Sequence, residues 1–516
     1  MPATTAHRSD GPLKILFAAA EVAPFSKTGG LGEVGGALPA ALAALGHEVV
    51  VVTPFYRSAW KAGPYLTPLD LTVHTWLGPQ YAGGRLWRSH LPNSEVPVIL
   101  VEHQGFFERD DPKAGHTFYQ YRTADGGMRD YEDNSRRYLF FCRAVLETMK
   151  ALDFWPDLLH CNDWHTGFLP VFLHAQTPLT PRHEHIRSLL SIHNCAYQGR
   201  FHKDELRWTG LGWDYFRMEM LEFHDKLNFL KAGIVFADGV NAVSQRYAQE
   251  IQGPDEGYGL DPVLREHRYK LTGIMNGVDY QVWNPASDRH LASTYGPDDL
   301  DDGKAACKTA LQQEMGLPVD PQVPLIGMVS RLVEQKGISL LRGAAWDLLN
   351  HDVQLVVLGT GEPDFENFLR TLAYTFPHKV AVSFQFNEAL AHRIMAGSDM
   401  YLMPSRFEPS GLNQLYALKY GTVNIVRETG GLADSVTDCS PQRLAQGVAT
   451  GFVFEDYHPM ALMWAVRRAL SVYHGQPDVW RQLQRNGMGQ DWSQERSAHG
   501  YVAAYRKLMA GVPLGT

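Results

Sequence analysis

Two stretches in the second half of the chain combine charged side chains with glycine where a helix is expected to begin. The first, Val329–Gly337, carries Arg331 and Lys336 in one loop. An arginine can bind a phosphate through two parallel hydrogen bonds, and a lysine adds a movable point charge. The loop therefore has the composition of a diphosphate clamp, although a solvated basic turn has the same composition.

The second stretch, Ser405-Arg-Phe-Glu-Pro-Ser-Gly-Leu-Asn413, places Glu408 just before the amides of Gly411 and Leu412. The carboxylate can bind sugar hydroxyls, and free amides at a helix start can bind a phosphate. The paired carboxylates of glycoside hydrolases form no motif here. The stretch thus favours transfer from an activated sugar, with an ordinary helix-start loop as the alternative.

A glycine-rich stretch in the first half, Lys27-Thr-Gly-Gly-Leu-Gly32, has the composition of an anion site. Gly29 and Gly30 let backbone amides approach a ligand, and Lys27 adds a charge. The residues Gly30–Gly35 also match G-x-G-x-x-G. We reject dinucleotide binding because about ten residues separate strand and glycine and the next strand ends without a carboxylate. A turn that only packs helix on sheet remains an alternative.

Polar residues follow two further apolar runs. His160, Asp163 and His165 lie in Leu159–His165, and His193 and Asn194 end Ser191–Asn194. Spacing alone allows a metal site in the first group, but a hydrogen-bonded pocket wall is favoured because no further cluster completes a metal site. A third group, Asn276-Gly-Val-Asp279, has turn chemistry, so a plain connector is its alternative.

The elements that must position these residues alternate between strand and helix. Lys14–Ala20 and Glu48–Thr53 are apolar runs typical of buried strands, and a helical pattern closed by Gly46 joins them. In the middle of this half we expect hairpin strands, a long loop and a helix, at Tyr65–Pro97, Gly105–Arg129 and Tyr138–Leu152.

The same order restarts near residue 323. We expect strands at Val323–Ser330, Val353–Gly359, Met400–Pro404 and Val423–Val426, and helices at Ile338–Asn350 and Gly411–Lys419. Strand–helix–strand units belong in parallel sheets. The sequence therefore predicts an α/β protein with two Rossmann-like, doubly wound domains that face an interdomain cleft.

Composition restricts the class of protein. The 516 residues are 45% hydrophobic and carry a formal net charge of −9, which fits packed domains and argues against a nucleic-acid partner. Five scattered cysteines suit a reducing compartment, and no apolar run could span a membrane. Because Met1–Gly11 lacks a signal-like apolar core, we expect a cytoplasmic protein.

Taken together, the motifs resemble the bacterial glycogen synthases and plant starch synthases. The resemblance runs from about Lys14 to Leu508 and depends on the order and spacing of its motifs. These are Lys27–Leu31, Asn162–His165, His193–Gly199, Leu230–Gly233, Ala242–Ser244, Asn276–Asp279, Ser330–Leu332, Gln335–Gly337, Pro404–Leu412 and Thr429–Asp434.

The resemblance implies a GT-B fold without a metal or other cofactor. It divides the chain into a disordered tail (1–12), an acceptor-side domain (13–278), a nucleotide-sugar domain (279–492) and a C-terminal helix (493–516) that returns to the first domain. It implies a retaining glucosyltransferase with ADP-glucose as donor and the non-reducing end of an α-1,4-glucan as acceptor. A UDP-sugar-dependent GT-B enzyme with a small acceptor, and a catalytically silent glucan-binding scaffold, are the alternatives.

The resemblance also implies roles for single residues. Arg331 and Lys336 bind the diphosphate, Glu408 holds the transferred glucose, and His193 stabilises the sugar as it reacts. The residues implied in substrate binding are Lys27, Gly29, Gly30, Glu33, Tyr131, Asp163, Asn194, Asn276, Ser410, Gly411, Leu412 and Asn413. Many relatives have Asp, Cys and Thr where this chain has Glu33, Ser410 and Asn413. If this chain differs from those relatives in activity, we expect the difference to lie in donor preference.

Overall fold

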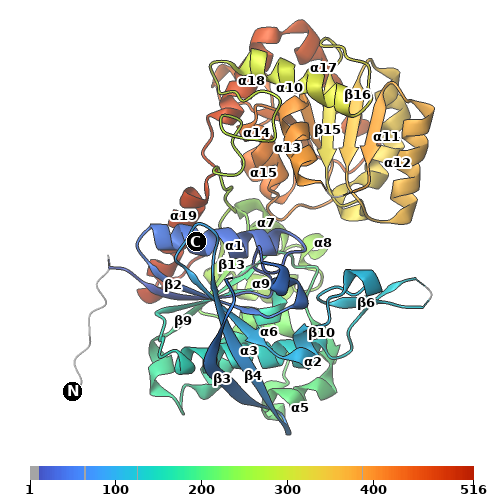
Figure 1. Cartoon of the computed structure of the whole chain (residues 1–516). Coiled ribbons are helices and arrows are strands. Elements are labelled where there is room, and N and C mark those ends of the chain that lie inside the picture. The colour runs from blue at the N-terminus through green and yellow to red at the C-terminus, as the bar shows by residue number, and fades with distance from the viewer. Residues whose placement is uncertain (1–10, 63–64, 125, 386, 516) are drawn as a thin grey trace. The chain divides into compact units, whose positions relative to one another are not determined.

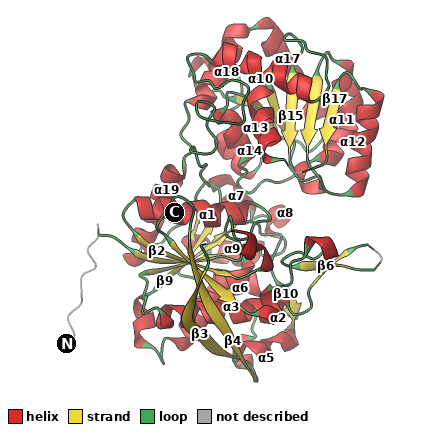
Figure 2. Cartoon of the chain, in the orientation of Figure 1, coloured by secondary structure: helices red, strands yellow, loops and turns green. Residues whose placement is uncertain are grey.

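The computed structural model describes residues 11–62, 65–124, 126–385 and 387–515. The first ten residues of the expected disordered tail lie outside this part of the chain. The chain forms two compact units, each an α/β unit (Figures 1 and 2). Unit 1 comprises Met1–Val243, Ala248–Ile274 and Gln494–Thr516, and unit 2 comprises Ser244–Tyr247 and Met275–Ser493.

Unit 2 is built on six parallel strands in the order β17-β16-β15-β18-β19-β20. This is the strand order of the Rossmann fold. Alternate residues of one strand enter different cores, Leu355 and Val357 on one face and Val356 and Leu358 on the other, so the sheet is covered on both faces. The strands are β15 (Leu325–Val329), β16 (Gln354–Leu358), β17 (Val380–Ser383), β18 (Met400–Met403), β19 (Val423–Arg427) and β20 (Gly451–Phe454).

The helices of unit 2 confirm the expected alternation. The helix predicted at Ile338–Asn350 is α11, whereas the helix predicted to begin at Gly411 begins at Asn413 because Gly411 has a φ of +68°. The others are α10 (Leu300–Glu314), α12 (Pro363–Thr375), α13 (Glu388–Gly397), α14 (Asn413–Lys419), α15 (Gly430–Ser435), α16 (Pro441–Ala445), α17 (Pro459–Gly475) and α18 (Pro477–Met488).

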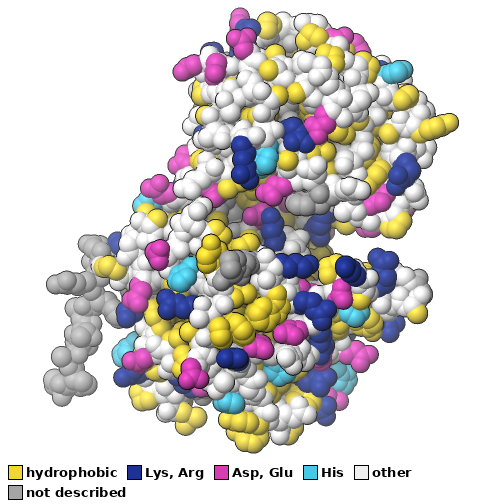
Figure 3. Space-filling view, in the orientation of Figure 1, with side chains coloured by type: hydrophobic (Ala, Val, Ile, Leu, Met, Phe, Trp, Pro, Cys, Tyr) yellow, Lys and Arg dark blue, Asp and Glu magenta, His cyan; other side chains and the backbone are white. Residues whose placement is uncertain are grey.

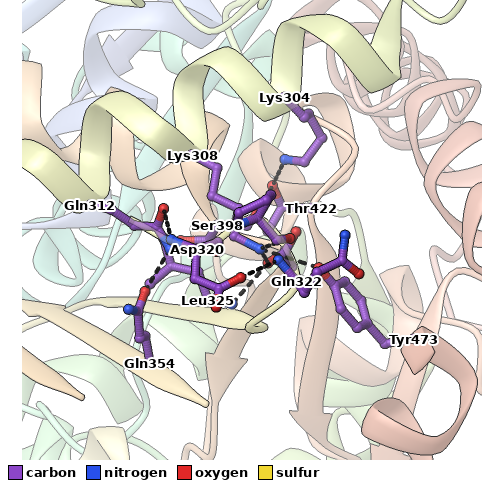
Figure 4. A network of polar contacts seen from close by, with 12 residues as sticks. Lys304, Lys308, Gln312, Asp320, Gln322, Leu325, Gln354, Ser398, Thr422 and Tyr473 are labelled. Atoms are coloured by element: carbon purple, nitrogen blue, oxygen red, sulfur yellow. Dashed lines mark hydrogen bonds and ion pairs between the residues drawn. The ribbon is translucent and has the colours of Figure 1, made fainter. Parts of the chain in front are cut away.

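Helix α10 is joined to the rest of unit 2 by two buried lysines (Figure 4). The Lys308 ammonium lies 2.7 Å from Oδ2 of Asp399, and both side chains are nearly buried. Lys304 donates to the carbonyl of Ala396 and to the hydroxyl of Thr422, each at 2.8 Å. Burial lowers the pKa of Lys304 to about 8. These contacts fix α10 against the end of α13 and the residues that precede β18 and β19.

Unit 1 contains a nine-stranded sheet in the order β14-β13-β9-β8-β1-β2-β5-β4-β3. The hairpin expected within Tyr65–Pro97 is formed by β3 and β4, which add antiparallel strands to seven parallel ones. The strands are β1 (Lys14–Ala18), β2 (Glu48–Pro54), β3 (Thr67–Leu77), β4 (Gln80–His90), β5 (Pro97–Glu102), β8 (Leu158–Asn162), β9 (Arg187–Ile192), β13 (Gly239–Ala242) and β14 (Leu271–Gly273). A second, three-stranded sheet holds β10 (Arg200–His202), β11 (Glu222–Phe223) and β12 (Lys226–Asn228).

Two helices from opposite ends of the chain share one core of unit 1. Leu38 of α1 (Gly30–Ala44) and Tyr505 of α19 (Gln494–Met509) belong to the same cluster as Phe17 of β1. The Tyr505 hydroxyl is also hydrogen-bonded to Nδ1 of His160, at 2.7 Å. The other helices are α3 (Asn134–Ala151), α4 (Phe168–Gln176), α5 (Leu206–Thr209), α6 (Phe229–Phe236), α7 (Gln245–Glu250), α8 (Pro254–Gly257) and α9 (Asp261–Glu266).

The prediction of one long loop over Gly105–Arg129 is wrong in part. A short helix, α2 (Gln104–Phe107), occupies its first residues, and β6 (Gln120–Arg122) pairs with β7 (Met128–Asp130). Three-residue strands leave no periodic pattern long enough to recognise in a sequence. The predicted helix at Tyr138–Leu152 is present as α3.

Within the described residues, no helix is long and apolar enough to cross a bilayer. All five cysteines are buried as free thiols.

Candidate functional site

The sheet of unit 2 brings its predicted residues to one edge. Strands β15 and β18 are neighbours at the point where the strand order reverses. Ligands of open α/β sheets bind outside the carboxyl ends of the strands at such a point. Arg331 and Lys336 follow β15, and Glu408 through Asn413 follow β18. The two motifs therefore meet at the edge of the sheet where a ligand is expected.

Lys336 and Glu408 form the centre of this edge. The Lys336 ammonium lies 2.9 and 2.6 Å from the two Glu408 carboxylate oxygens. The Ser405 hydroxyl donates to the same carboxylate at 3.0 Å. Glu408 is 6% exposed, so solvent screens this ion pair weakly. The pair holds a cation and a carboxylate in fixed positions, side by side.

A glycine lets the Lys336 turn come close to the segment that leads to Glu408. Gly337 has a φ of +74°, and a Cβ atom there would lie 2.0 Å from the carbonyl oxygen of Pro404. Only glycine tolerates both conditions. The turn that carries Lys336 can therefore pack directly against the segment that carries Glu408.

Two further predicted residues of unit 2 have polar groups without a partner. Arg331 is exposed, and within the described residues its guanidinium has neither a hydrogen-bond nor an ion-pair partner. Asn276 is 6% exposed, and its side-chain oxygen is buried with no hydrogen-bond partner in the part of the chain that the structure describes. An unpaired cation and an unpaired buried acceptor suit a ligand that carries both an anion and hydroxyl groups.

The remaining predicted residues of unit 2 flank this edge. The Asn413 amide donates to the carbonyl of Val329, at 2.7 Å, and so joins the start of α14 to the end of β15. The Ser410 hydroxyl contacts the sulfur of Met275 at 3.7 Å. Gly411 and Leu412 precede α14, with Leu412 at its N-cap.

In unit 1, as in unit 2, predicted site residues follow the strands at the point where the strand order reverses. Its strand order reverses between β1 and β8, and Asp163 follows β8 while the glycine-rich loop follows β1. His193 and Asn194 follow β9, the next strand. Except for Tyr131, the predicted substrate-binding residues of the first half thus follow the carboxyl ends of three adjacent strands.

Asp163 organises this edge. One carboxylate oxygen accepts hydrogen bonds from the amides of His193, at 2.7 Å, and Asn194, at 3.4 Å. The backbone of Asp163, with φ +56° and ψ −175°, lies in a region that is essentially restricted to glycine. Strain of this kind clusters at active sites and ligand clamps. Burial raises the pKa of Asp163 to about 7, although the two amides oppose the shift.

The protonation of His193 follows from its neighbours. The Asn162 side-chain amide donates to the carbonyl of Ala18, so its oxygen must accept the hydrogen bond from Nε2 of His193, at 3.0 Å. The proton of the neutral ring therefore sits on Nε2. Burial lowers the pKa of His193 to about 4, which keeps the ring neutral at pH 7.

Of the two histidines weighed as metal ligands, His160 has hydrogen-bond partners, whereas both ring nitrogens of His165 are buried without one in the described part of the chain. His160 is hydrogen-bonded to Ser191 and Tyr505, and His165 stacks on Trp164 with ring centroids 4.0 Å apart. Across the described ranges, no three His, Cys, Asp or Glu side chains are grouped to hold a metal ion.

The glycines after β1 divide into two kinds. A Cβ atom on Gly35 would lie 2.5 Å from the carbonyl oxygen of Glu21, so Gly35 is required for packing. A Cβ atom on Gly29 or Gly30 would meet no atom within 4 Å. Packing therefore explains why residue 35 is glycine. It does not explain Gly29 and Gly30, which have open space beside them. Lys27, beside them, forms a 2.5 Å ion pair with Glu33.

Tyr131 lies apart from these groups in unit 1, at a cavity of about 480 Å³ that Arg57, Arg109 and His116 also line. Its ring stacks on Tyr121, with centroids 5.5 Å apart. The Arg109 guanidinium lies over the Tyr131 ring, 5.3 Å from its centroid. The structure thus places a rigid aromatic ring beside cations.

Three supporting residues escaped the sequence analysis. Glu21 is buried and accepts hydrogen bonds from the hydroxyls of Thr28 and Tyr119, each at 2.7 Å. Asn162 orients His193, and Ser405 binds Glu408. One sequence feature could have identified them: each is a polar residue at the end of an apolar strand or shortly after it.

Family models and curated relatives match most of the chain. Residues 14–266 match the starch synthase catalytic domain, and residues 313–485 match the glycosyl transferases group 1 domain. A glycogen synthase of Anaeromyxobacter sp. is 47% identical over 96% of this chain and its own full length. Glycogen synthase 1 of Methylococcus capsulatus is 44% identical over 98% of each chain.

Solved structures agree as well. The catalytic domain of starch synthase IV from Arabidopsis thaliana, bound to ADP and acarbose, matches with a TM-score of 0.86 and 32% identity, over 97% of this chain and 100% of that one. Sucrose-phosphate synthase from Thermosynechococcus elongatus, with a TM-score of 0.58 and 18% identity over 96% and 99% of the two chains, shares the fold. The expected fold class, two Rossmann-like domains of the GT-B type, is confirmed. The chain belongs to the glycogen synthase and starch synthase family of glucosyltransferases.

Proposed function

We propose that the protein transfers glucose from ADP-glucose to the 4-hydroxyl at the non-reducing end of an α-1,4-glucan, with retention of configuration. The observation that carries the proposal is the Lys336–Glu408 ion pair, together with the unpaired Arg331 in the same loop as Lys336. This set offers two cations for a diphosphate and a carboxylate for sugar hydroxyls. The ADP and acarbose bound to the Arabidopsis enzyme support a nucleotide and a glucan-like ligand.

In this proposal unit 2 holds the donor. Arg331 and Lys336 bind the diphosphate and stabilise the negative charge that develops on it as the bond to glucose breaks. Glu408 accepts hydrogen bonds from the glucose hydroxyls. The amides of Gly411 and Leu412 bind the distal phosphate, and Ser410 and Asn413 shape the donor's surroundings.

Four further residues are assigned to the glucose and acceptor side. Asp163, Asn194 and Asn276 bind the sugar, while the backbone carbonyl of His193 faces the positive charge that develops on its ring. Because the His193 ring is neutral at pH 7, it does not supply a proton to the leaving group. The departing phosphate takes the proton of the attacking hydroxyl. The groups assigned to the donor phosphates and the nucleotide are Lys27, Gly29, Gly30, Glu33 and Tyr131.

A donor panel tests the function directly. Purified protein is supplied with ADP-glucose or UDP-glucose and a maltooligosaccharide primer, and release of the nucleotide and chain elongation are measured. We expect elongation with ADP-glucose. A preference for UDP-glucose with a small acceptor would indicate the other type of GT-B enzyme. Glucan binding without release of ADP would indicate a silent scaffold.

The open space beside Gly30 yields a prediction. We expect Gly30→Ala to raise KM for ADP-glucose at least about tenfold while the free energy of unfolding changes by no more than about 0.5 kcal/mol. The added methyl group would meet no protein atom within 4 Å and would enter the space that the proposal assigns to the donor. Gly35→Ala is the matched control and should instead destabilise the protein, since its Cβ would lie 2.5 Å from a carbonyl oxygen. An unchanged KM in Gly30→Ala would assign the loop to packing alone. Initial rates and urea unfolding give the two readouts.

Asp163 yields a pH dependence. The pKa of its carboxyl is about 7 in the folded protein and about 4 when unfolded, so the folded state binds the proton more tightly. Stability contributed by this group is therefore present below pH 4 and lost as the pH rises toward 7. As the pH rises from 4.5 to 7.5, we expect the free energy of unfolding of Asp163→Asn to increase relative to that of the parent protein. Urea unfolding at a series of pH values measures this difference. The control, Asp70→Asn at an exposed site, should show no such trend.

A further inference from the structure

Gln414 is a buried polar residue that the proposed reaction does not use. It is the second residue of α14, and its side chain is 0% exposed. Its amide nitrogen donates to the carbonyl oxygens of Ser410, at 2.9 Å, and Gly411, at 3.1 Å. One side chain therefore holds two successive carbonyl groups of the loop that follows β18.

The neighbours of Gln414 fix the orientation of its amide group. The Ser435 hydroxyl donates its proton to the carbonyl of Gly431, so it can only accept the hydrogen bond that it shares with Gln414, at 3.3 Å. Carbonyl oxygens also only accept hydrogen bonds. Because all three neighbours are acceptors, the NH2 group of Gln414 must face them and its oxygen must point elsewhere.

The hydrogen bonds of Gln414 also set the direction of two backbone N–H groups. A trans peptide unit points its carbonyl and its N–H group in opposite directions. The carbonyl of Ser410 shares a trans unit with the N–H of Gly411, and the carbonyl of Gly411 shares the next with the N–H of Leu412. Since Gln414 binds both carbonyls, both N–H groups point away from it. Neither is hydrogen-bonded to any residue that the structure describes.

The two preceding carbonyl groups of the loop are bound as well. The N–H of Gly431 donates to the carbonyl of Glu408, at 3.0 Å, and the hydroxyl of Ser244, a residue of unit 2, donates to the carbonyl of Pro409, at 2.6 Å. With the two that Gln414 binds, four successive carbonyl groups accept hydrogen bonds from within unit 2. The backbone of this loop therefore presents donors rather than acceptors to a ligand.

Directed donors matter for an anion in this unit. On the face of unit 2 that Figure 3 shows, Lys and Arg side chains are scattered among Asp and Glu side chains. A surface of mixed charge attracts an anion only weakly as a whole. Successive backbone N–H groups that point to one side, by contrast, form a concave anion site. The direction of these N–H groups thus decides whether the loop can bind a phosphate.

We propose that Gln414 is a positioning residue for the distal phosphate of the donor, and that it sets the preference of the site for a nucleoside diphosphate over a monophosphate. The inference rests on the proposed function, in which the amides of Gly411 and Leu412 bind this phosphate. Gln414 acts through these amides and does not touch the ligand, because its NH2 group is occupied by backbone carbonyls. Fixed N–H groups stabilise the charge that develops on the phosphate without having to reorient first.

The test compares full-length Gln414→Met with the parent protein by calorimetric titration with ADP and with AMP. Methionine has a similar length but cannot donate a hydrogen bond, so the two peptide units are free to turn. We expect the Kd for ADP to rise about tenfold or more. The Kd for AMP, which lacks the distal phosphate, should change less than about twofold. With ADP-glucose, kcat should fall at least about tenfold.

Gln484→Met is the matched control. Gln484 is also a buried glutamine in a helix of unit 2, α18, and it donates to the carbonyl of Gly421 at 2.9 Å. Both variants leave a backbone carbonyl without its donor and should lower the midpoint of urea unfolding. Only Gln414→Met should change the ratio of the two dissociation constants. If Gln414→Met does not fold, Gln414→Glu, which keeps the shape of the side chain but replaces the donor by an oxygen, takes its place.

Two results would overturn the inference. Equal weakening of ADP and AMP would show that Gln414 supports the whole site rather than the two amides. Unchanged ADP binding would show that the amides keep their direction without it. If the parent shows neither ADP binding nor transfer from ADP-glucose, the proposed function fails and the inference fails with it. If the parent prefers ADP to AMP and the variant keeps that preference, only the role of Gln414 fails.

Discussion

Lys336→Ala is expected to lower kcat for transfer from ADP-glucose by a factor on the order of 10²–10³, the usual cost of removing one preorganised group that stabilises developing charge. The Lys336 ammonium is held 2.6 Å from Glu408 at the carboxyl ends of β15 and β18. Without it, Arg331 alone would face the charge that develops on the leaving diphosphate. Incorporation of radiolabelled glucose into glycogen measures the loss.

A loss of folding must be separated from a loss of chemistry, because Lys336→Ala also leaves the buried Glu408 carboxylate unpaired. Lys336→Met keeps the length of the side chain but still leaves Glu408 unpaired, whereas Lys336→Ala/Glu408→Gln removes the stranded charge. The double variant should therefore fold and remain inactive, and urea unfolding shows whether Lys336→Met folds as well. Arg342→Ala breaks an exposed ion pair with Asp364 and serves as the control with normal activity. Near-normal turnover in a folded Lys336 variant would refute the clamp.

Lys308→Ala is expected to destabilise unit 2 by about 3–5 kcal/mol, because it leaves a nearly buried carboxylate, that of Asp399, without its partner. Oδ2 of Asp399 also accepts a hydrogen bond from the amide of Leu325, at 2.8 Å, so the charge sits at the start of the central strand β15. The Lys308 ammonium further donates to the carbonyl of Pro321, at 3.0 Å.

Hydrogen exchange of peptides from β15 and β18, measured across a urea series, reports the stability of unit 2 separately from that of unit 1. Arg342→Ala again provides the matched control, since an exposed ion pair contributes about 0–1 kcal/mol. A loss below about 1 kcal/mol in Lys308→Ala would show that water reaches Asp399 and replaces the lysine.

Elements with long apolar or periodic patterns could be predicted from the sequence. Buried parallel strands form continuous apolar runs, so β2, β16 and β19 were recognised to within about two residues, and the 13-residue helix α11 was predicted at its observed bounds. The short strands β6 and β7 were missed because three residues carry no periodicity.

The candidate site could be predicted in its composition but not in its contacts. The motifs placed Lys336 and Glu408 at strand ends, yet their pairing joins residues 72 positions apart and depends on β15 and β18 being neighbours. Strand order is a property of the whole sheet, and neither motif contains a pattern that indicates which strands are neighbours. The late start of α14 likewise depends on the left-handed conformation of Gly411, which a helical pattern does not encode.

The position of α19 has a consequence for biosynthesis. Domains generally fold as units from the N-terminus while the ribosome is still adding residues. Unit 1 cannot follow this order, because Tyr501 and Tyr505 of α19 complete the core around β1 and are synthesised after all of unit 2. A nascent chain therefore carries an unfinished unit 1 with an uncovered apolar face throughout the synthesis of unit 2. We expect this interval to be the period when the protein depends most on chaperones, and stalled chains that end before Gln494 to be their preferred clients.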